Sequence, residues 1–168
     1  MGCGKSKTGR RLAAHARLPF TDLDKLFETR TGTQIDDFFS RYSEADFRRI
    51  EAELLHETAT NTDTVISLGG GTPCFGDNME WIQKHGFSVY LKMNELSLLQ
   101  RLCSSPKKRP LLAGLSADEM LEHICKQLTQ RETFYLQADL LYSGINVDIP
   151  SLWDKIQQAL PLKQLPNE

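Results

Sequence analysis

The chain begins with a glycine-rich loop that leads directly into a helical segment. Residues 2–6 read Gly-Cys-Gly-Lys-Ser, and helix-compatible sequence follows to Arg17. Glycines let backbone N–H groups curl around phosphate oxygens, and the N-terminal end of the following helix carries a positive partial charge. The pattern is the second half of a phosphate-binding loop, in which Lys5 would reach the β- and γ-phosphates and Ser6 would bind Mg²⁺.

The full motif, G-x-x-x-x-G-K-[ST], has a first glycine that would lie upstream of Met1, and the apolar strand that feeds such a loop is also absent. Two interpretations stay open: a fortuitous match, or a chain that starts inside the motif. We expect that Met1 is an internal methionine of the true protein. The native start would then lie about ten residues upstream, the length of one strand with its turn.

The length and composition of the chain are typical of one globular domain with a buried hydrophobic core. The chain has 168 residues and a formal net charge of −2, and it contains no apolar run of membrane-spanning length. We therefore expect a cytoplasmic monomer without a nucleic-acid or membrane partner. The cysteines form no C-x-x-C pair, which fits a reduced, intracellular protein, and no histidine has the spacing of a zinc ligand.

Short apolar segments alternate with longer amphipathic ones, which predicts an α/β fold with a mainly parallel sheet. Strands are expected at residues 20–24, 64–68, 87–91 and 140–147. Helices are expected at 5–17, 25–29, 33–39, 44–58, 77–85, 95–103, 117–133 and from 148 to about 160. The strand before a phosphate loop is normally central, so its absence would leave both neighbouring strands without a ladder partner.

Several polar positions are candidates for a binding site. Asp22 and Asp24 would share one face of an extended segment, although either could instead cap the next helix. Arg48 and Glu51 are spaced to pair on a helix, which as a surface ion pair would contribute little to stability. The three glycines 69–71 follow a buried strand and would allow close approach of a ligand, the alternative being a flexible turn.

A basic loop bounded by prolines covers residues 104–112. It could be an ordinary solvated connection. In a protein that handles phosphate it would be a mobile, cationic lid, able to close over the transferring charge.

Taken in order along the chain, these segments closely resemble shikimate kinase. The resemblance runs from Met1 to roughly Ile156, and it rests on Gly4-Lys5-Ser6, the stretch 20–24, Phe47-Arg48-Arg49-Ile50-Glu51, Gly69-Gly70-Gly71, Arg109-Pro110-Leu111-Leu112 and Arg131. It implies a three-layer P-loop kinase fold with a parallel sheet of order 2-3-1-4-5, of which strand 1 is missing here. Residues 1–168 would form a single domain, with shikimate-binding helices at about 32–59 and a lid at about 104–115.

The family transfers the γ-phosphate of ATP to the 3-hydroxyl of shikimate, on the route to chorismate and the aromatic amino acids. By resemblance, Mg²⁺ would bind at Ser6 and Asp22, and the phosphates at Gly2, Cys3, Gly4, Lys5, Ser6, Lys7 and Arg109. Shikimate would be held by Asp24, Phe39, Phe47, Arg48, Gly69, Gly70, Gly71 and Arg131. Lys5, Asp24 and Arg109 would be catalytic, with Asp24 as the base for the attacking hydroxyl and the arginines clamping the substrate carboxylate.

The chain departs from the family pattern at Lys7, where Thr or Ser is usual, at Leu68, where Thr is common, and at the absent first strand. Other readings are a related small-molecule kinase of the gluconate kinase type, or a truncated chain with little or no activity. A third alternative is a nucleic-acid binder. The basic residues argue against it, because they cluster only in the lid. Arg101 is a candidate for contact with the adenine.

Overall fold

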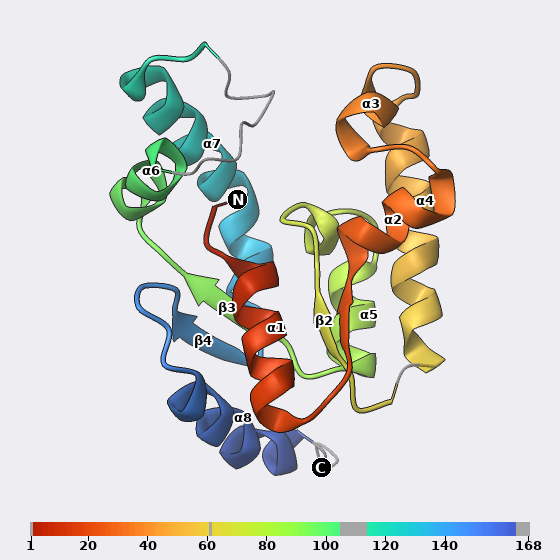
Figure 1. Ribbon diagram of the computed structural model, residues 1–168, viewed down its shortest axis with the longest axis vertical. Helices are drawn as coiled ribbons and strands as arrows, with labels where there is room; N and C mark the ends of the chain where they lie inside the picture. Colours follow the sequence, from red (N-terminus) through yellow and green to blue (C-terminus); the bar gives the residue numbers. More distant parts are fainter. Residues whose placement is uncertain (1, 61, 105–113, 164–168) are drawn as a thin grey trace.

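The computed structural model describes residues 2–60, 62–104 and 114–163 as helices on two short parallel sheets (Figure 1). The helices are α1 (Lys5–Ala16), α2 (Leu23–Thr31), α3 (Ile35–Phe39), α4 (Glu44–Glu57), α5 (Asn78–His85), α6 (Glu95–Cys103), α7 (Ala117–Tyr135) and α8 (Ile149–Lys163). The strands are β1 (Phe20–Asp22), β2 (Val65–Ser67), β3 (Val89–Lys92) and β4 (Leu140–Ser143), and short 3₁₀ turns span Thr58–Thr60 and Thr72–Cys74. Within these described ranges no helix combines the length and apolarity needed to cross a bilayer.

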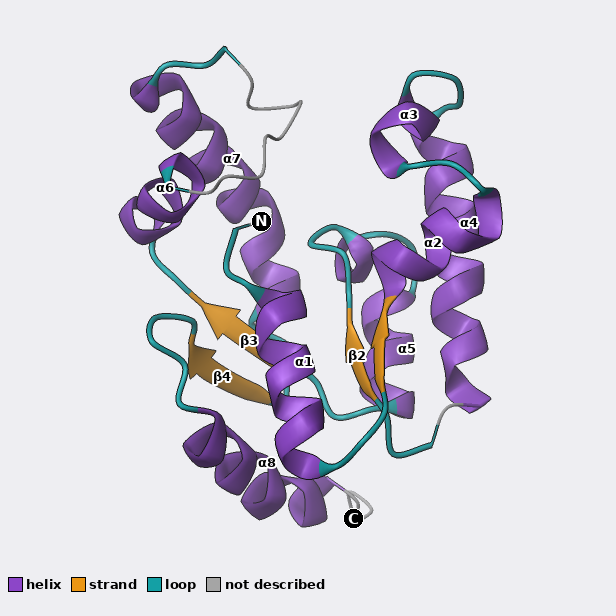
Figure 2. Cartoon of the chain, viewed as in Figure 1, coloured by secondary structure: helices purple, strands orange, loops and turns teal. Residues whose placement is uncertain are grey.

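The strands pair in two separate sheets. β1 lies parallel to β2, with Phe20 opposite Val65, and β3 lies parallel to β4, with Val89 opposite Leu140. Figure 2 shows the two sheets side by side, with α1 in front of the strands and α5 and α7 behind them. This arrangement is the expected α/β, three-layer fold with parallel strands, and its order matches the family order without its first strand.

Three apolar clusters hold the layers together. One joins α2, α3 and α4 through Leu23, Phe27, Phe38, Phe47 and Leu54, among others. A second joins α1 to α8 over the strands, through Leu12, Leu152 and Ile156. The third joins α6 to α7 through Leu98 and Ile124. Hence the elements that carry the candidate site are fixed by separate clusters.

The helix positions follow the sequence expectations within a few residues, and two local expectations are wrong. Asp24 does not lie on a strand: β1 ends at Asp22, and α2 starts at Leu23. Asp22 and Asp24 therefore do not share a strand face, although Asp22 stands at the N-cap position, as the alternative allowed. Residues 145–147 are not part of the last strand, which ends at Ser143.

Candidate active site

The candidate residues gather at the carboxyl ends of the parallel strands. Asp22 ends β1 and lies in register with Ser67, which ends β2. The glycines 69–71 follow β2, and Lys5 begins α1. The carboxyl ends of parallel strands are where open α/β sheets bind ligands. Residues that are distant in the sequence thus meet at one edge.

The glycine-rich loop has the backbone conformation that its glycines permit. Gly2 and Gly4 have φ of 77° and 85°, in the left-handed region that side chains disfavour. Gly4 precedes α1 and accepts the backbone N–H of Thr8 at 2.9 Å. Arg101 of α6 donates from Nη1 to the Cys3 carbonyl at 2.8 Å. Arg101 is therefore placed at this loop, and its expected contact with adenine stays a prediction.

Two hydroxyl oxygens lie close together beside this loop, next to the end of β1. The Ser6 and Ser67 hydroxyls lie 3.4 Å apart, and Asp22 is the strand partner of Ser67. No group of three or more His, Cys, Asp or Glu side chains with metal-binding geometry occurs in the part of the chain that the structure describes. Mg²⁺ is usually held by one or two carboxylates together with water and substrate phosphates. The donor set around Ser6 and Asp22 fits that mode.

Asp24 lies on the first turn of α2, within electrostatic range of four other ionisable groups, Lys5, Asp22, Glu28 and Glu51. Desolvation by the surrounding protein atoms raises the pKa of its carboxyl, although part of the residue stays exposed to solvent. The negative charges of Asp22 and Glu51 raise this pKa further. Lys5 acts in the opposite direction and lowers it. The Asp24 carboxylate therefore lies within electrostatic reach of both the phosphate loop and α4.

Arg48 is held on α4 by two carboxylates. Its Nη1 donates to Glu51 at 2.7 Å, and its Nη2 donates to Glu44 at 3.1 Å. The expected pair with Glu51 is confirmed, but it is not a surface pair, because the Glu51 side chain is 4 % exposed. Glu51 also accepts from the Thr72 hydroxyl at 2.6 Å, and Asn78 donates to the Thr72 carbonyl at 2.8 Å.

Aromatic rings border the Arg48 guanidinium. Its Cζ lies 3.8 Å from the centroid of Phe75 and 5.0 Å from that of Phe47. Phe47 is buried within the α2–α4 cluster, whereas Phe39 is 43 % exposed and packs on Phe47 at 4.7 Å between centroids. The expectation that Phe39 and Phe47 line the ring pocket of a substrate stays a prediction.

Two of the three glycines after β2, Gly69 and Gly71, pass close to charged side chains. A Cβ at Gly69 would lie 2.9 Å from Glu51 Oε1 and 3.1 Å from Asp24 Oδ1. A Cβ at Gly71 would lie 2.8 Å from the Arg48 guanidinium nitrogens. Between them, the Gly70 carbonyl accepts the phenolic O–H of Tyr135 at 2.5 Å. The backbone therefore passes against the charged side chains without room for a side chain of its own.

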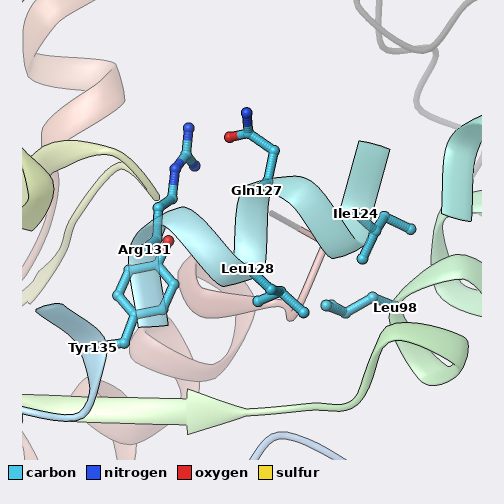
Figure 3. A pocket seen from close by; sticks show the side chains of 6 residues that line it. All are labelled: Leu98, Ile124, Gln127, Leu128, Arg131 and Tyr135. Carbon is cyan, nitrogen blue, oxygen red and sulfur yellow. The ribbon is translucent and has the colours of Figure 1, made fainter. Parts of the chain in front are cut away.

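Arg131 reaches the same region from α7. Figure 3 shows Arg131 and Gln127 on the upper side of α7, whereas Leu128 and Ile124 are directed toward Leu98, around a cavity of about 20 Å³. Burial raises the pKa of the Cys74 thiol, while the charges of Arg131 and Arg48 lower it. Both guanidinium groups therefore lie near Cys74, so the two expected arginines face one region.

Four functional neighbours were not anticipated: Ser67, Thr72, Phe75 and Tyr135. Ser67 and Thr72 flank the recognised glycines, and Tyr135 lies one helical turn after Arg131, but no motif marked any of them. Lys7 lies on the exposed side of α1. Arg109 and most of the expected lid lie outside the described residues.

Comparisons with known proteins agree on one family. The family model for shikimate kinase matches residues 1–160. The shikimate kinase of Bacteroides fragilis is 42 % identical over 166 residues, covering 98 % of this chain and 93 % of the relative. The crystal structure of shikimate kinase from Bacteroides thetaiotaomicron superposes with a TM-score of 0.88 at 36 % identity, over 96 % of this chain and 94 % of that one.

A further structure, the shikimate kinase of Acinetobacter baumannii in complex with shikimate, has a TM-score of 0.80 and 30 % identity, and covers 99 % of this chain and 91 % of that chain.

Proposed function

The chain belongs to the shikimate kinase family, and on that premise we propose that it transfers the γ-phosphate of ATP to the 3-hydroxyl of shikimate. The observation that carries the proposal is the position of Asp24. Its pKa responds to Lys5 on one side and to Glu51, the partner of Arg48, on the other. One carboxylate thus connects a phosphate loop to an arginine-lined acceptor site.

At the acceptor end, Arg48 and Arg131 bind the carboxylate of shikimate. The position of Arg48 is set in advance by Glu51 and Glu44 and by its contact with the Phe75 ring. Guanidinium groups bind planar carboxylates through paired N–H donors, which lysine cannot reproduce. The glycine backbone at 69–71 lets the substrate approach without obstruction.

At the reacting end, Asp24 accepts the hydrogen bond of the attacking hydroxyl. As the new bond from that oxygen to the γ-phosphorus forms, the bond from phosphorus to ADP breaks and the hydroxyl proton passes to Asp24. Lys5 neutralises charge on the phosphates, which is the main catalytic contribution in phosphoryl transfer. Asp24 must be deprotonated to accept this proton, and its raised pKa makes the carboxylate a stronger base than an ordinary aspartate.

Mg²⁺ would be held by Ser6 and Asp22 and would neutralise charge on the β- and γ-phosphates. Gly2, Cys3, Gly4 and Lys7 would complete the phosphate loop, and Arg109 would reach the phosphates from the lid. That the protein acts as a cytoplasmic monomer stays a prediction from its sequence.

The test is phosphorylation of shikimate with ATP and Mg²⁺, followed by ³¹P NMR of the product, on the wild type, Arg48→Lys and Arg49→Lys. We expect shikimate 3-phosphate from the wild type. In Arg48→Lys we expect kcat/KM for shikimate to fall about a hundredfold, the value of roughly 2.7 kcal/mol of charge-assisted hydrogen bonding.

Arg49→Lys is the matched control, because Arg49 is exposed on the same helix and pairs with Glu53. It should leave kcat/KM unchanged. A folded protein that phosphorylates gluconate and leaves shikimate unmodified would contradict the proposal and indicate the gluconate kinase type instead.

A further inference from the structure

The Arg48 guanidinium contacts two carboxylates of its own chain. Its Nε and Nη2 both donate to Oε1 of Glu44, at 3.3 and 3.1 Å, and its Nη1 donates to Oε2 of Glu51 at 2.7 Å. Nε and Nη2 form one of the paired edges through which a guanidinium binds a carboxylate. Glu44 therefore holds the kind of donor pair that the carboxylate of a substrate requires.

A third carboxylate on Arg48 would be opposed by the two that are already there. Glu44 and Glu51 together carry two negative charges against the single positive charge of the guanidinium. Like charges a few ångströms apart repel each other, and the repulsion is stronger in a partly buried site than in water. The Arg48 side chain is only 17 % exposed. A substrate carboxylate therefore binds Arg48 best when one of the two glutamates leaves it.

Glu51 is fixed in its place. Its side chain is 4 % exposed, and its Oε1 accepts the Thr72 hydroxyl at 2.6 Å. The backbone at Gly69 lies against the same oxygen, which a Cβ there would approach to 2.9 Å. A buried carboxylate that lost its guanidinium partner would keep an uncompensated charge, which is strongly unfavourable. Glu51 therefore stays on Arg48 whether or not a substrate is bound.

Glu44 has the opposite properties. Its side chain is 60 % exposed, and within the described ranges Arg48 is the residue that its carboxylate binds. Water can replace this partner. Glu44 also lies in the first turn of α4, where the positive partial charge of the helix N-terminus favours a free carboxylate. Because an exposed ion pair of this kind contributes little to stability, the release of Glu44 costs little.

We propose that Glu44 is a specificity-determining residue of the acceptor site. It occupies the Nε and Nη2 donors of Arg48 in the free protein and gives them up to the carboxylate of the substrate. The inference rests on the proposed function, in which Arg48 binds that carboxylate. Until the substrate binds, Glu44 keeps the guanidinium oriented and its charge compensated. A ligand without a negative charge cannot replace Glu44 in this way, so the exchange selects carboxylated substrates.

The test measures shikimate binding by isothermal titration calorimetry without nucleotide, on the full chain and on Glu44→Gln. The glutamine keeps the length of the side chain and loses its charge, so the substrate no longer competes with an anion. We expect shikimate to bind about threefold more tightly, which is the effect of one exposed ion pair. Glu53→Gln is the matched control, because Glu53 is exposed on the same helix and pairs with Arg49. It should leave the affinity unchanged.

Glu44→Asp separates the occupation of Arg48 from the general effect of a negative charge. The aspartate keeps the charge at the start of the helix but is one methylene shorter, so it should lose Nε and Nη2 and also tighten shikimate binding. The capping box between Ser43 and Asp46 is untouched in both variants, so α4 should start as in the wild type. A role of Glu44 as a mere support for Arg48 predicts weaker binding in both variants.

A neutral ligand, the carboxamide analogue of shikimate, should bind equally to the wild type and to Glu44→Gln. Unchanged or weaker binding of shikimate in Glu44→Gln would overturn the inference. So would wild-type affinity in Glu44→Asp, or an equal gain in affinity for the carboxamide. Phosphorylation of shikimate by the wild type would leave the proposed function standing in each of these cases. A folded wild type that neither binds nor phosphorylates shikimate would overturn the proposed function, and this inference with it.

Discussion

The acceptor side and the phosphate side of the candidate site are held in different ways. On the acceptor side, hydrogen bonds run from Asn78 to Thr72 and from Thr72 to Glu51, which are buried residues, and from the partly buried Arg48 to Glu51. On the phosphate side, Arg101 holds the Cys3 carbonyl, while Cys3 and Lys5 line a cavity between the two sheets. One side is supported by a network of side chains, whereas the other is a backbone loop held by an arginine of α6.

The difference shows which part of the site depends on the sheet. Side-chain networks within α4 and the turn after β2 can position Arg48 without a continuous sheet. A phosphate loop is positioned by the backbone of the strands beside it. Changes on the acceptor side should therefore alter stability and shikimate binding, and nucleotide binding should change little.

The largest effect is expected from Glu51→Ala. This change removes the buried acceptor of the Thr72 hydroxyl and leaves the partly buried Arg48 guanidinium with the exposed Glu44 as its remaining carboxylate partner, so the free energy of unfolding should fall by about 3 kcal/mol. Glu53→Ala, on the same helix, breaks an exposed pair with Arg49 and should lower it by about 0.5 kcal/mol or less. Urea unfolding followed by circular dichroism measures both, and equal losses would contradict the side-chain-supported acceptor site.

Gly71→Ala should displace Arg48 while leaving the fold intact. The new Cβ would lie 2.8 Å from both terminal guanidinium nitrogens, so the arginine must move. We expect kcat/KM for shikimate to fall about thirtyfold, which corresponds to about 2 kcal/mol, the value of a hydrogen bond to a charged group. KM for ATP should change little.

Gly86→Ala is the control for this substitution, because the nearest atom to its Cβ would be the Ile82 carbonyl at 3.7 Å. Steady-state kinetics with each substrate varied in turn separate the two effects. An equal rise in KM for ATP in Gly71→Ala would mean that the two sides of the site are not independent.

Much of the fold could be predicted from the sequence because its signals are local. The capping boxes at Ser43 and Ser116 mark the starts of α4 and α7, and the glycines 69–71 directly follow a buried strand. These features depend on neighbouring residues and on the alternation of apolar and amphipathic segments, both of which can be seen directly in the sequence.

The missed features depend on contacts between distant segments. The spacing of Arg48 and Glu51 predicts a pair, but the burial of Glu51 depends on Thr72, which lies 21 residues further along the chain. The contact between Tyr135 and Gly70 joins residues 65 positions apart. Asp24 was assigned to a strand because two alternating carboxylates fit an extended segment as well as they fit a helix start. The burial of these residues and their contacts with residues distant in the same chain cannot be derived from local sequence patterns.

Tyr135→Phe should weaken shikimate binding moderately. The change removes the hydrogen bond to the Gly70 carbonyl, so the glycine segment loses a contact that fixes its orientation. A neutral hydrogen bond contributes about 1 kcal/mol, which predicts about a fivefold rise in KM for shikimate with kcat nearly unchanged. Tyr142→Phe is the control, because that phenol also donates to a backbone carbonyl, Asp148, away from the site. The same rise in both variants would exclude a specific positioning role.

The smallest effect on stability concerns the charge of Asp24, and it has a defined dependence on pH. Because the pKa of Asp24 is raised in the folded protein, the folded state binds this proton more tightly than the unfolded state does. The resulting stabilisation is fully present below the ordinary pKa of 3.8 and is lost as the pH rises through the raised value. Above that value the ionised carboxylate disfavours the folded state.

Asp24→Asn should therefore abolish activity and slightly raise the melting temperature at pH 7, and the gain in melting temperature should disappear as the pH falls below the raised pKa. Glu28→Gln removes one of the charges that raise this pKa, so it should shift the acidic limb of kcat/KM to lower pH and keep the rate at neutral pH. Melting curves and pH–rate profiles measure the two effects. A lower melting temperature of Asp24→Asn at pH 7 would mean that the surroundings stabilise the ionised Asp24 carboxylate. It would contradict the raised pKa of Asp24 in the folded protein.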